Sequence, residues 1–153
     1  MTHRAPILLL AALVLTSIRA LGAQTVSVSG NPALLRISTA VAGTDPTSVS
    51  NAVTTYTVTT PSPGNNKYQV LMSLNANMPA GVTLSATLAA PVGSNGTSNG
   101  AIALDVTPRS MVINIKKNFN GTASITYQLV ATAAAGVIPN SSRTVTLTAT
   151  TYP

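Results

Sequence analysis

The sequence predicts an all-β protein, an antiparallel immunoglobulin-like β-sandwich of about eight or nine short strands. Apolar and polar residues alternate with a period of two along most of the chain, so each segment has one face for a core and one for solvent. Turn residues interrupt this alternation at short intervals, as in the Asn-Gly pairs at 95–96 and 120–121. Outside the leader no segment carries apolar residues at helical spacing. A closed barrel is the alternative, because strand number alone does not distinguish the two.

The first residues have the layout of a secretory signal peptide. Arg4 supplies a basic start, and an apolar run covers 7–15. Small residues precede the expected cleavage point: Ala20, Gly22 and Ala23. The apolar run is shorter than the roughly 20 residues that a transmembrane helix needs. We therefore expect a signal-peptide helix over 1–23, cleaved after Gly22 or Ala23.

The rest of the chain, 24–153, is expected to be a single β-sandwich domain, because its length suits one domain and its composition does not change along the way. After leader removal nothing else in it suggests a membrane anchor. We expect a secreted, periplasmic or cell-surface protein of a bacterium.

Five strands are expected in the first half of the domain, at 24–29, 34–38, 54–60, 67–74 and 82–88. Each places apolar residues at alternate positions, such as Tyr56 and Val58 in the third. The last two have the least interrupted apolar faces and are therefore expected inside the sheets. Gly and Pro clusters at 30–32, 43–46 and 61–66 provide the turns between strands.

Four further strands are expected at 102–106, 111–115, 122–132 and 143–152, the first of them ended by Pro108. The last strand has Val145, Leu147 and Ala149 on one face. Its other face carries a row of threonines: Thr144, Thr146, Thr148 and Thr150. We expect this strand to pair within its own sandwich.

Two corners of the chain resemble each other. The segment 42–48 leads to the threonine-rich strand at 54–60, and the segment 135–141 leads to the last strand. Two interpretations are open: equivalent crossings at matching ends of the sandwich, or similar turn chemistry that arose independently.

Composition excludes most catalytic and metal chemistry. The chain has no cysteine, its single histidine is His3 in the leader, and its only acidic residues are Asp45 and Asp105. Nucleophile systems that need histidine are therefore absent from the expected mature chain. Two isolated aspartates beside turns do not suit a carboxylate pair or a transition-metal site. We expect no enzymatic activity, no cofactor and no metal.

The charge pattern argues against a nucleic-acid partner. Beyond the leader, six basic and two acidic residues leave a net charge of +4. The basic residues are scattered, except for Lys116 and Lys117, and aromatic residues are few. Nucleic-acid-binding proteins usually cluster basic residues and combine them with stacking aromatics. We expect no nucleic-acid binding.

The threonine row of the last strand is the candidate interaction surface, and Thr55, Thr57 and Thr59 form a similar row. Rows of hydroxyl and methyl groups would suit carbohydrate, ice or another strand. The competing interpretation is that threonine is simply a good solvent-facing strand residue. Sugar sites usually stack an aromatic ring on the sugar, and most aromatics of this chain are expected in the core.

Three segments and the leader resemble those of a known kind of protein. They are Pro-Ala-Gly-Val-Thr-Leu at 79–84, Ile-Thr-Tyr-Gln-Leu at 125–129 and Arg-Thr-Val-Thr-Leu-Thr at 143–148. Together they resemble small secreted bacterial proteins with an immunoglobulin-like or pilin-like sandwich. The resemblance implies a subunit of a surface fibre or coat, in which an edge groove accepts a strand from the next subunit. The chain departs from typical chaperone–usher subunits, since it lacks their cysteine pair and a long N-terminal donor extension.

These observations predict an exported, non-enzymatic structural or adhesive surface protein, a fibre or coat subunit that assembles through sheet edges. Its expected partners are itself or other surface proteins. The alternative is a soluble extracellular binding module for a glycan or a protein partner.

Overall fold

The computed structural model describes residues 23–32, 34–38, 41, 43–62 and 66–153, and it contains nine strands. In chain order they are β1 Thr25–Ser29, β2 Val49–Thr60, β3 Lys67–Leu74, β4 Val82–Leu88, β5 Thr97–Ser98, β6 Ala101–Ala103, β7 Arg109–Ile115, β8 Phe119–Ala131 and β9 Val145–Tyr152. A short 3-10 turn, η1 Ala133–Ala135, follows β8. The predicted signal-peptide helix lies, apart from Ala23, outside the described residues.

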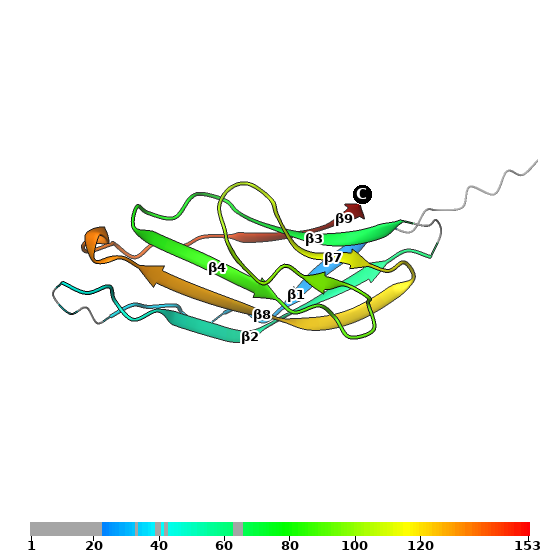
Figure 1. Ribbon diagram of the computed structural model, residues 1–153, viewed down its shortest axis with the longest axis horizontal. Coiled ribbons are helices and arrows are strands. Elements are labelled where there is room, and N and C mark those ends of the chain that lie inside the picture. Colours follow the sequence, from blue (N-terminus) through cyan, green and yellow to red (C-terminus); the bar gives the residue numbers. More distant parts are fainter. Residues whose placement is uncertain (1–22, 33, 39–40, 42, 63–65) are drawn as a thin grey trace, which may run out of the picture.

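The strands form two antiparallel sheets that pack as two layers (Figure 1). The five-stranded sheet has the order β1-β2-β8-β4-β6, and the four-stranded sheet has the order β5-β7-β3-β9. The predicted antiparallel β-sandwich is therefore confirmed, and two separate sheets distinguish it from a closed barrel. The strands predicted at 67–74 and 82–88 are β3 and β4, and both lie inside their sheets as expected.

The order of the strands is immunoglobulin-like. In an immunoglobulin domain, strands A, B, E and D form one sheet and strands C, F and G the other. Here β1, β2, β8 and β4 take the places of A, B, E and D, while β3 and β9 take those of C and F. The three short strands β5, β6 and β7 are an insertion between D and E that widens both sheets. No described strand takes the place of G beside β9.

The core lies between the two sheets and contains the residues that alternation predicts to face inward. The largest fully buried apolar side chains are Tyr56, Met72, Leu88, Met111, Ile115 and Ile125. The Tyr56 hydroxyl donates a hydrogen bond to the Ala89 carbonyl at 2.7 Å, so its buried polar group is satisfied. Burial raises the pKa of both Tyr56 and Tyr127, because the charged phenolate is poorly solvated there.

Four expected elements differ in the structure, and one of them is the Asn-Gly turn at 120–121, which lies within β8 and pairs with β2. The segment 34–38 is not a strand, and Leu34 is 86% exposed because no neighbouring strand covers it. The strand expected at 102–106 is the shorter β6, because Asp105 accepts a hydrogen bond from the Thr107 N–H and turns the chain. Strand β2 begins earlier than expected, with a shift of register between Asn51 and Thr54.

The two corners of similar sequence are not equivalent crossings. The connection from β8 to β9 passes from one sheet to the other, whereas the described part of 42–48 leads from β1 to β2 within a single sheet. The interpretation as equivalent crossings is therefore wrong, because only the connection from β8 to β9 crosses between the sheets. The corners nevertheless meet at one end of the sandwich, where the Ala133 N–H donates to Asp45 Oδ1 at 2.7 Å.

Candidate functional site

The predicted threonine row lies along β9, with Thr146 and Thr148 exposed and Thr150 half-buried. Thr144 precedes the strand and its N–H donates to Asn75 Oδ1 at 2.9 Å. The three threonines within the strand pair with residues of β3: Ser73, Leu71 and Gln69. The row is therefore one border of the outer face of the four-stranded sheet.

Strand β9 is also an edge strand. It pairs with β3 along all its residues without a register shift, and no described strand pairs with its other edge. The Asn75 N–H donates to the Thr144 carbonyl at 3.0 Å. Because backbone hydrogen bonds alternate in direction along an antiparallel strand, the N–H and C=O groups of Val145, Leu147 and Ala149 are directed away from β3. These groups are available to another strand.

The two sides of the sandwich have different edges. On one side the sheets end in β5 and β6, which contain two and three residues. On the other side they end in β1 and β9, which contact each other and contain five and eight residues. Very short edge strands offer little to a pairing partner. The side formed by β1 and β9 is therefore the open side of the fold.

A second hydroxyl surface covers the outer face of the five-stranded sheet. The register aligns Ser27 of β1, Thr57 of β2 and Thr122 of β8 in one row across the strands. The Oγ1 atoms of Thr57 and Thr122 are 2.7 Å apart, and Asn120 Nδ2 donates to Thr59 Oγ1 at 2.7 Å. The sequence indicated the row along β2 but not its neighbours, because their alignment depends on strand pairing.

Two hollows lie toward the end of the sandwich where the two corners meet. The outer hollow has a volume of about 1070 Å³ and the inner hollow a volume of about 350 Å³. Leu129 lines the outer hollow and Tyr127 the inner one, and both lie on the inward face of β8. Ser142 and Arg143, which are consecutive residues, also line the outer and inner hollows respectively. The two hollows are therefore neighbours, but they share no lining residue.

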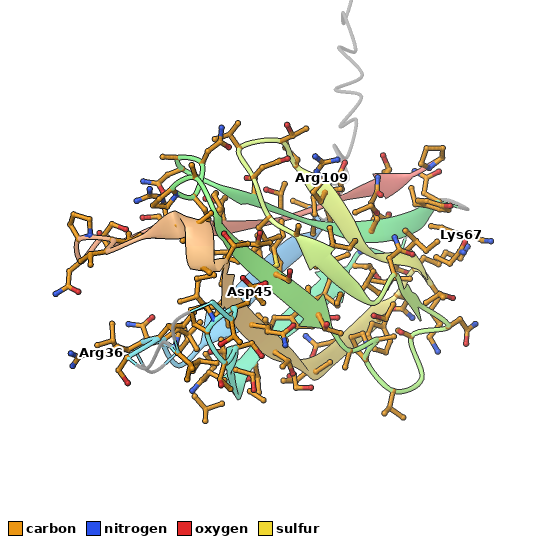
Figure 2. All side chains as sticks on the ribbon, turned by 60° about the vertical axis from the view of Figure 1, so that its left-hand side comes forward. Arg36, Asp45, Lys67 and Arg109 are labelled. Atoms are coloured by element: carbon orange, nitrogen blue, oxygen red, sulfur yellow. The ribbon has the colours of Figure 1, made fainter. Side chains whose placement is uncertain are left out.

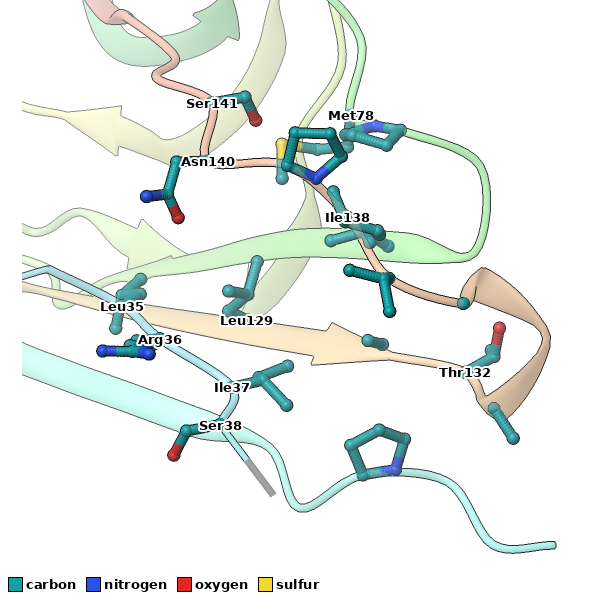
Figure 3. A pocket seen from close by; sticks show the side chains of 18 of the residues that line it. Leu35, Arg36, Ile37, Ser38, Met78, Leu129, Thr132, Ile138, Asn140 and Ser141 are labelled. Atoms are coloured by element: carbon teal, nitrogen blue, oxygen red, sulfur yellow. The ribbon is translucent and has the colours of Figure 1, made fainter. Parts of the chain in front are cut away.

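The outer hollow is mainly aliphatic. Figure 3 shows Leu35 and Leu129 on one side of it and Met78 and Ile138 on the other. The segment 34–38 contributes to one wall, and the connection from β8 to β9 forms the opposite wall. Sequence reasoning placed 34–38 in a sheet and therefore missed this hollow.

The inner hollow brings three polar side chains together with apolar ones. Thr54 is fully buried, and its Oγ1 has no hydrogen-bond partner among the described residues. Tyr127 is 4% exposed. Arg143 Nε donates to the Asn77 carbonyl at 3.0 Å and Nη1 donates to the Ser142 carbonyl at 2.8 Å, so the guanidinium is held in place. None of the described residues that line either hollow is acidic.

The two aspartates make separate local contacts. Asp105 accepts hydrogen bonds from Arg109 Nη2 and from the Thr107 N–H. These two bonds hold the pKa of Asp105 below its ordinary value, and the bond from Arg109 has the larger effect. Asp45 accepts the bond from Ala133. Within the described part of the chain, no group of three His, Cys, Asp or Glu residues is placed to hold a metal ion.

Among the described residues, no helix is long and apolar enough to cross a membrane. Comparison with known proteins found no match to the chain among protein-family models, curated proteins or solved structures.

Proposed function

We propose that the protein is an exported, non-enzymatic structural or adhesive surface protein that joins other copies, or other surface proteins, through its sheet edges. The free edge of β9 is the observation that carries this proposal. It is eight residues long and lies where an immunoglobulin domain has strand G. It contains no lysine, proline or bulge, which are the usual features that block strand addition.

The other parts of the proposal rest on the sequence. The leader-like segment 1–23 supports export, and the shortage of catalytic residue types beyond it supports a non-enzymatic role. The local hydrogen bonds of Asp45 and Asp105 agree with structural roles for both carboxylates. The uncharged threonines of β9 place no like charges between two copies that meet along this edge.

Substitution of Thr148 by lysine tests the role of the edge. Thr148→Lys adds a charge to the exposed side chain of an edge strand. Thr83→Lys adds the same charge to exposed Thr83, which pairs with Val130 and belongs to β4, a strand that is not at a sheet edge. We expect concentration-dependent multimers of the unchanged protein and of Thr83→Lys, and a shift toward monomer for Thr148→Lys. Sedimentation velocity and electron microscopy measure both. A purified protein that stays monomeric and forms no fibres at high concentration contradicts self-assembly.

A soluble binding module for a glycan is the second candidate, and the hydroxyl rows of both outer faces favour it. Tyr56, Tyr68 and Tyr127 are buried and cannot stack on a sugar at these surfaces. A glycan array with the unchanged protein tests this function. Thr146→Ala/Thr148→Ala and Thr57→Ala/Thr122→Ala then determine which face binds, and an array without signal excludes the glycan.

A further inference from the structure

The open side of the fold leaves inward-facing apolar residues of both sheets incompletely covered. Val28 of β1 pairs with the buried Tyr56 and so lies on the core side of its sheet, yet it is 47% exposed. On β9, the inward residues Val145, Leu147 and Ala149 pair with buried residues of β3 but are themselves only partly buried. An extension of the four-stranded sheet beyond β9 would cover these three residues.

The free backbone groups of β9 belong to the same three residues. The N–H and C=O groups of Val145, Leu147 and Ala149 are directed away from β3. The next residue of this set, Thr151, differs because its carbonyl accepts a hydrogen bond from Gln69 Nε2 at 3.2 Å. Strand β9 therefore offers a continuous run of three N–H and three C=O groups, centred on Leu147.

A second copy of β9 fits this run when the two strands are antiparallel and a two-fold axis passes beside Leu147. Leu147 then lies opposite Leu147 of the second copy, and Val145 lies opposite Ala149 of the second copy. Each opposed pair exchanges two backbone hydrogen bonds, so every free group of the three residues is used.

Other registers are less favourable. Sliding the second copy by one residue would oppose free groups with groups that already bond to β3. Sliding it by two residues in one direction places Val145 opposite Thr151, whose carbonyl is engaged by Gln69. The backbone therefore selects the register centred on Leu147.

The side chains agree with this register on both faces. On the inner face, Leu147 meets its own copy and adds an apolar contact at the centre. On the outer face, Thr146 lies opposite Thr148 of the second copy, and threonine pairs of this kind stabilise antiparallel strands. Strand β9 contains no charged residue, and Figure 2 shows Lys67 and Arg36 at opposite ends of the sandwich. The uncharged edge favours an identical strand over a strongly acidic or basic partner.

We propose that two copies of the protein pair β9 to β9 in this antiparallel register, so that their four-stranded sheets become one continuous sheet. The proposal rests on the proposed assembly through sheet edges and specifies the partner strand, its direction and its register. Both copies use the same surface, so this contact closes after two subunits. A fibre would need a further contact elsewhere on the dimer.

Cysteine cross-linking tests the register directly, because the chain has no cysteine of its own. In the proposed register, exposed Thr146 lies opposite exposed Thr148 of the second copy at a non-hydrogen-bonded position, where Cα atoms are about 4.5 Å apart and a disulfide can form. Thr146→Cys or Thr148→Cys alone places its two sulfurs on a diagonal, where Cα atoms are about 7–8 Å apart and a disulfide does not form.

We expect oxidation of a mixture of Thr146→Cys and Thr148→Cys to give at least about tenfold more disulfide dimer than oxidation of either variant alone. An affinity tag on one variant separates mixed from identical pairs on a non-reducing gel. Thr83→Cys mixed with Thr148→Cys is the matched control, because Thr83 is exposed on β4, which is not an edge strand. This mixture should give no specific cross-link.

Ala149→Pro tests the backbone contact by a second measurement. It removes an N–H that is directed away from β3, and proline is tolerated at such positions of an edge strand. By symmetry the dimer loses two hydrogen bonds, so we expect its dissociation constant in sedimentation velocity to rise about tenfold or more. Circular dichroism and thermal unfolding confirm that the variant is folded.

Several results overturn the proposal. Efficient cross-linking of Thr148→Cys alone, or of Thr146→Cys alone, contradicts the register. Cross-linking of Ser27→Cys with Thr148→Cys shows that β1 of the second copy is the partner instead. In these cases the protein still associates through a sheet edge, so the proposed function stands while the β9 pair fails. Association without a cross-link in any mixture places the contact away from β9, and a protein that stays monomeric contradicts both the β9 pair and self-assembly.

Discussion

At the scale of single residues, Gly81 shows why a particular residue type is required at a turn. Its φ of +77° lies in the left-handed region that favours glycine. A Cβ atom at this position would lie 2.8 Å from the Ala135 Cβ and 2.9 Å from Thr132 Oγ1. The Thr132 N–H donates to the Gly81 carbonyl at 2.8 Å, so the turn before β4 is fastened to the residues around η1.

We expect Gly81→Ala to destabilise the protein more than Gly93→Ala. Gly93 has a similar φ of +76°, but a Cβ there would meet nothing within 4 Å. Gly93→Ala should therefore lower the free energy of unfolding only by the cost of the left-handed conformation for alanine, about 1–2 kcal/mol. Gly81→Ala should lower it by this cost and, in addition, by the cost of the close contacts. Urea unfolding monitored by circular dichroism measures the difference. Equal free energies of unfolding for the two variants would mean that the contacts of Gly81 carry no cost.

The unpartnered hydroxyl of Thr54 predicts an unusual gain in stability. Thr54→Val keeps the shape of the side chain and removes the buried Oγ1 that has no hydrogen bond within the described structure. We expect the free energy of unfolding to rise by about 1 kcal/mol or more, because the cost of burying the hydroxyl disappears. Thermal unfolding measures the change. A less stable Thr54→Val variant shows that the hydroxyl is satisfied in solution.

The buried tyrosines predict a loss of stability at alkaline pH. Burial raises the pKa of Tyr56 and Tyr127 above the ordinary value of 10.0. The unfolded chain therefore loses these protons first, so the stabilisation is complete below pH 10 and decreases as the pH rises further. We expect the free energy of unfolding to fall above pH 10, with a slope of at most about 1.4 kcal/mol per pH unit for each tyrosine.

Tyr56→Phe is the variant that tests this slope. It removes the hydrogen bond to Ala89 and should lower stability at neutral pH, but it also removes one titrating group. Its free energy of unfolding should therefore depend less steeply on pH above pH 10 than that of the unchanged protein. Urea unfolding at a series of pH values measures both slopes, and identical slopes contradict the assignment.

At the scale of elements, β8 and β1 differ in how many strands of the five-stranded sheet flank them. Strand β8 has β2 on one side and β4 on the other, and its inward residues Ile125 and Tyr127 lie in the core. Strand β1 pairs only with β2, and Val26 is its one apolar residue that packs against the core. Val28 is 47% exposed. Alternation alone does not distinguish such strands, because both have a period of two.

Hydrogen exchange should distinguish them. We expect the amides of β8 that face β2 and β4 to exchange slowest, through global unfolding, and those of β1 to exchange fastest among the strands of this sheet, through local opening. Exchange measured by nuclear magnetic resonance gives the protection factor of each amide. Protection of β1 equal to that of β8 would indicate that another contact covers the β1 edge, as expected in an assembled form.

At the scale of the whole molecule, one core joins the two sheets. Residues of both sheets belong to the same buried cluster, and the chain has no cysteine that could hold a part of it independently. We expect one cooperative unfolding transition, with coincident midpoints by tyrosine fluorescence and by far-ultraviolet circular dichroism, unaffected by reductant. Two separated transitions would show that the sheets unfold independently.

The sequence by itself determined the strands and their inward faces for most of this domain. Alternation identified Tyr56 and Val58 as core residues, because the side-chain period of a strand is a local property of the backbone. Alternation wrongly predicted a strand at 34–38, because this segment has no partner strand in the described structure. Residue types also limited the catalytic chemistry available to residues 24–153 before any contact was known.

Only the tertiary structure decided which strands are neighbours, and hence where a partner could bind. The threonine row of β9 was visible in the sequence, but its position at a free edge follows from pairing with β3 alone. Thr54, Tyr127 and Arg143 line the same hollow although they are far apart in the chain. Strand pairing and cavities depend on long-range contacts, which a local pattern of alternation does not encode.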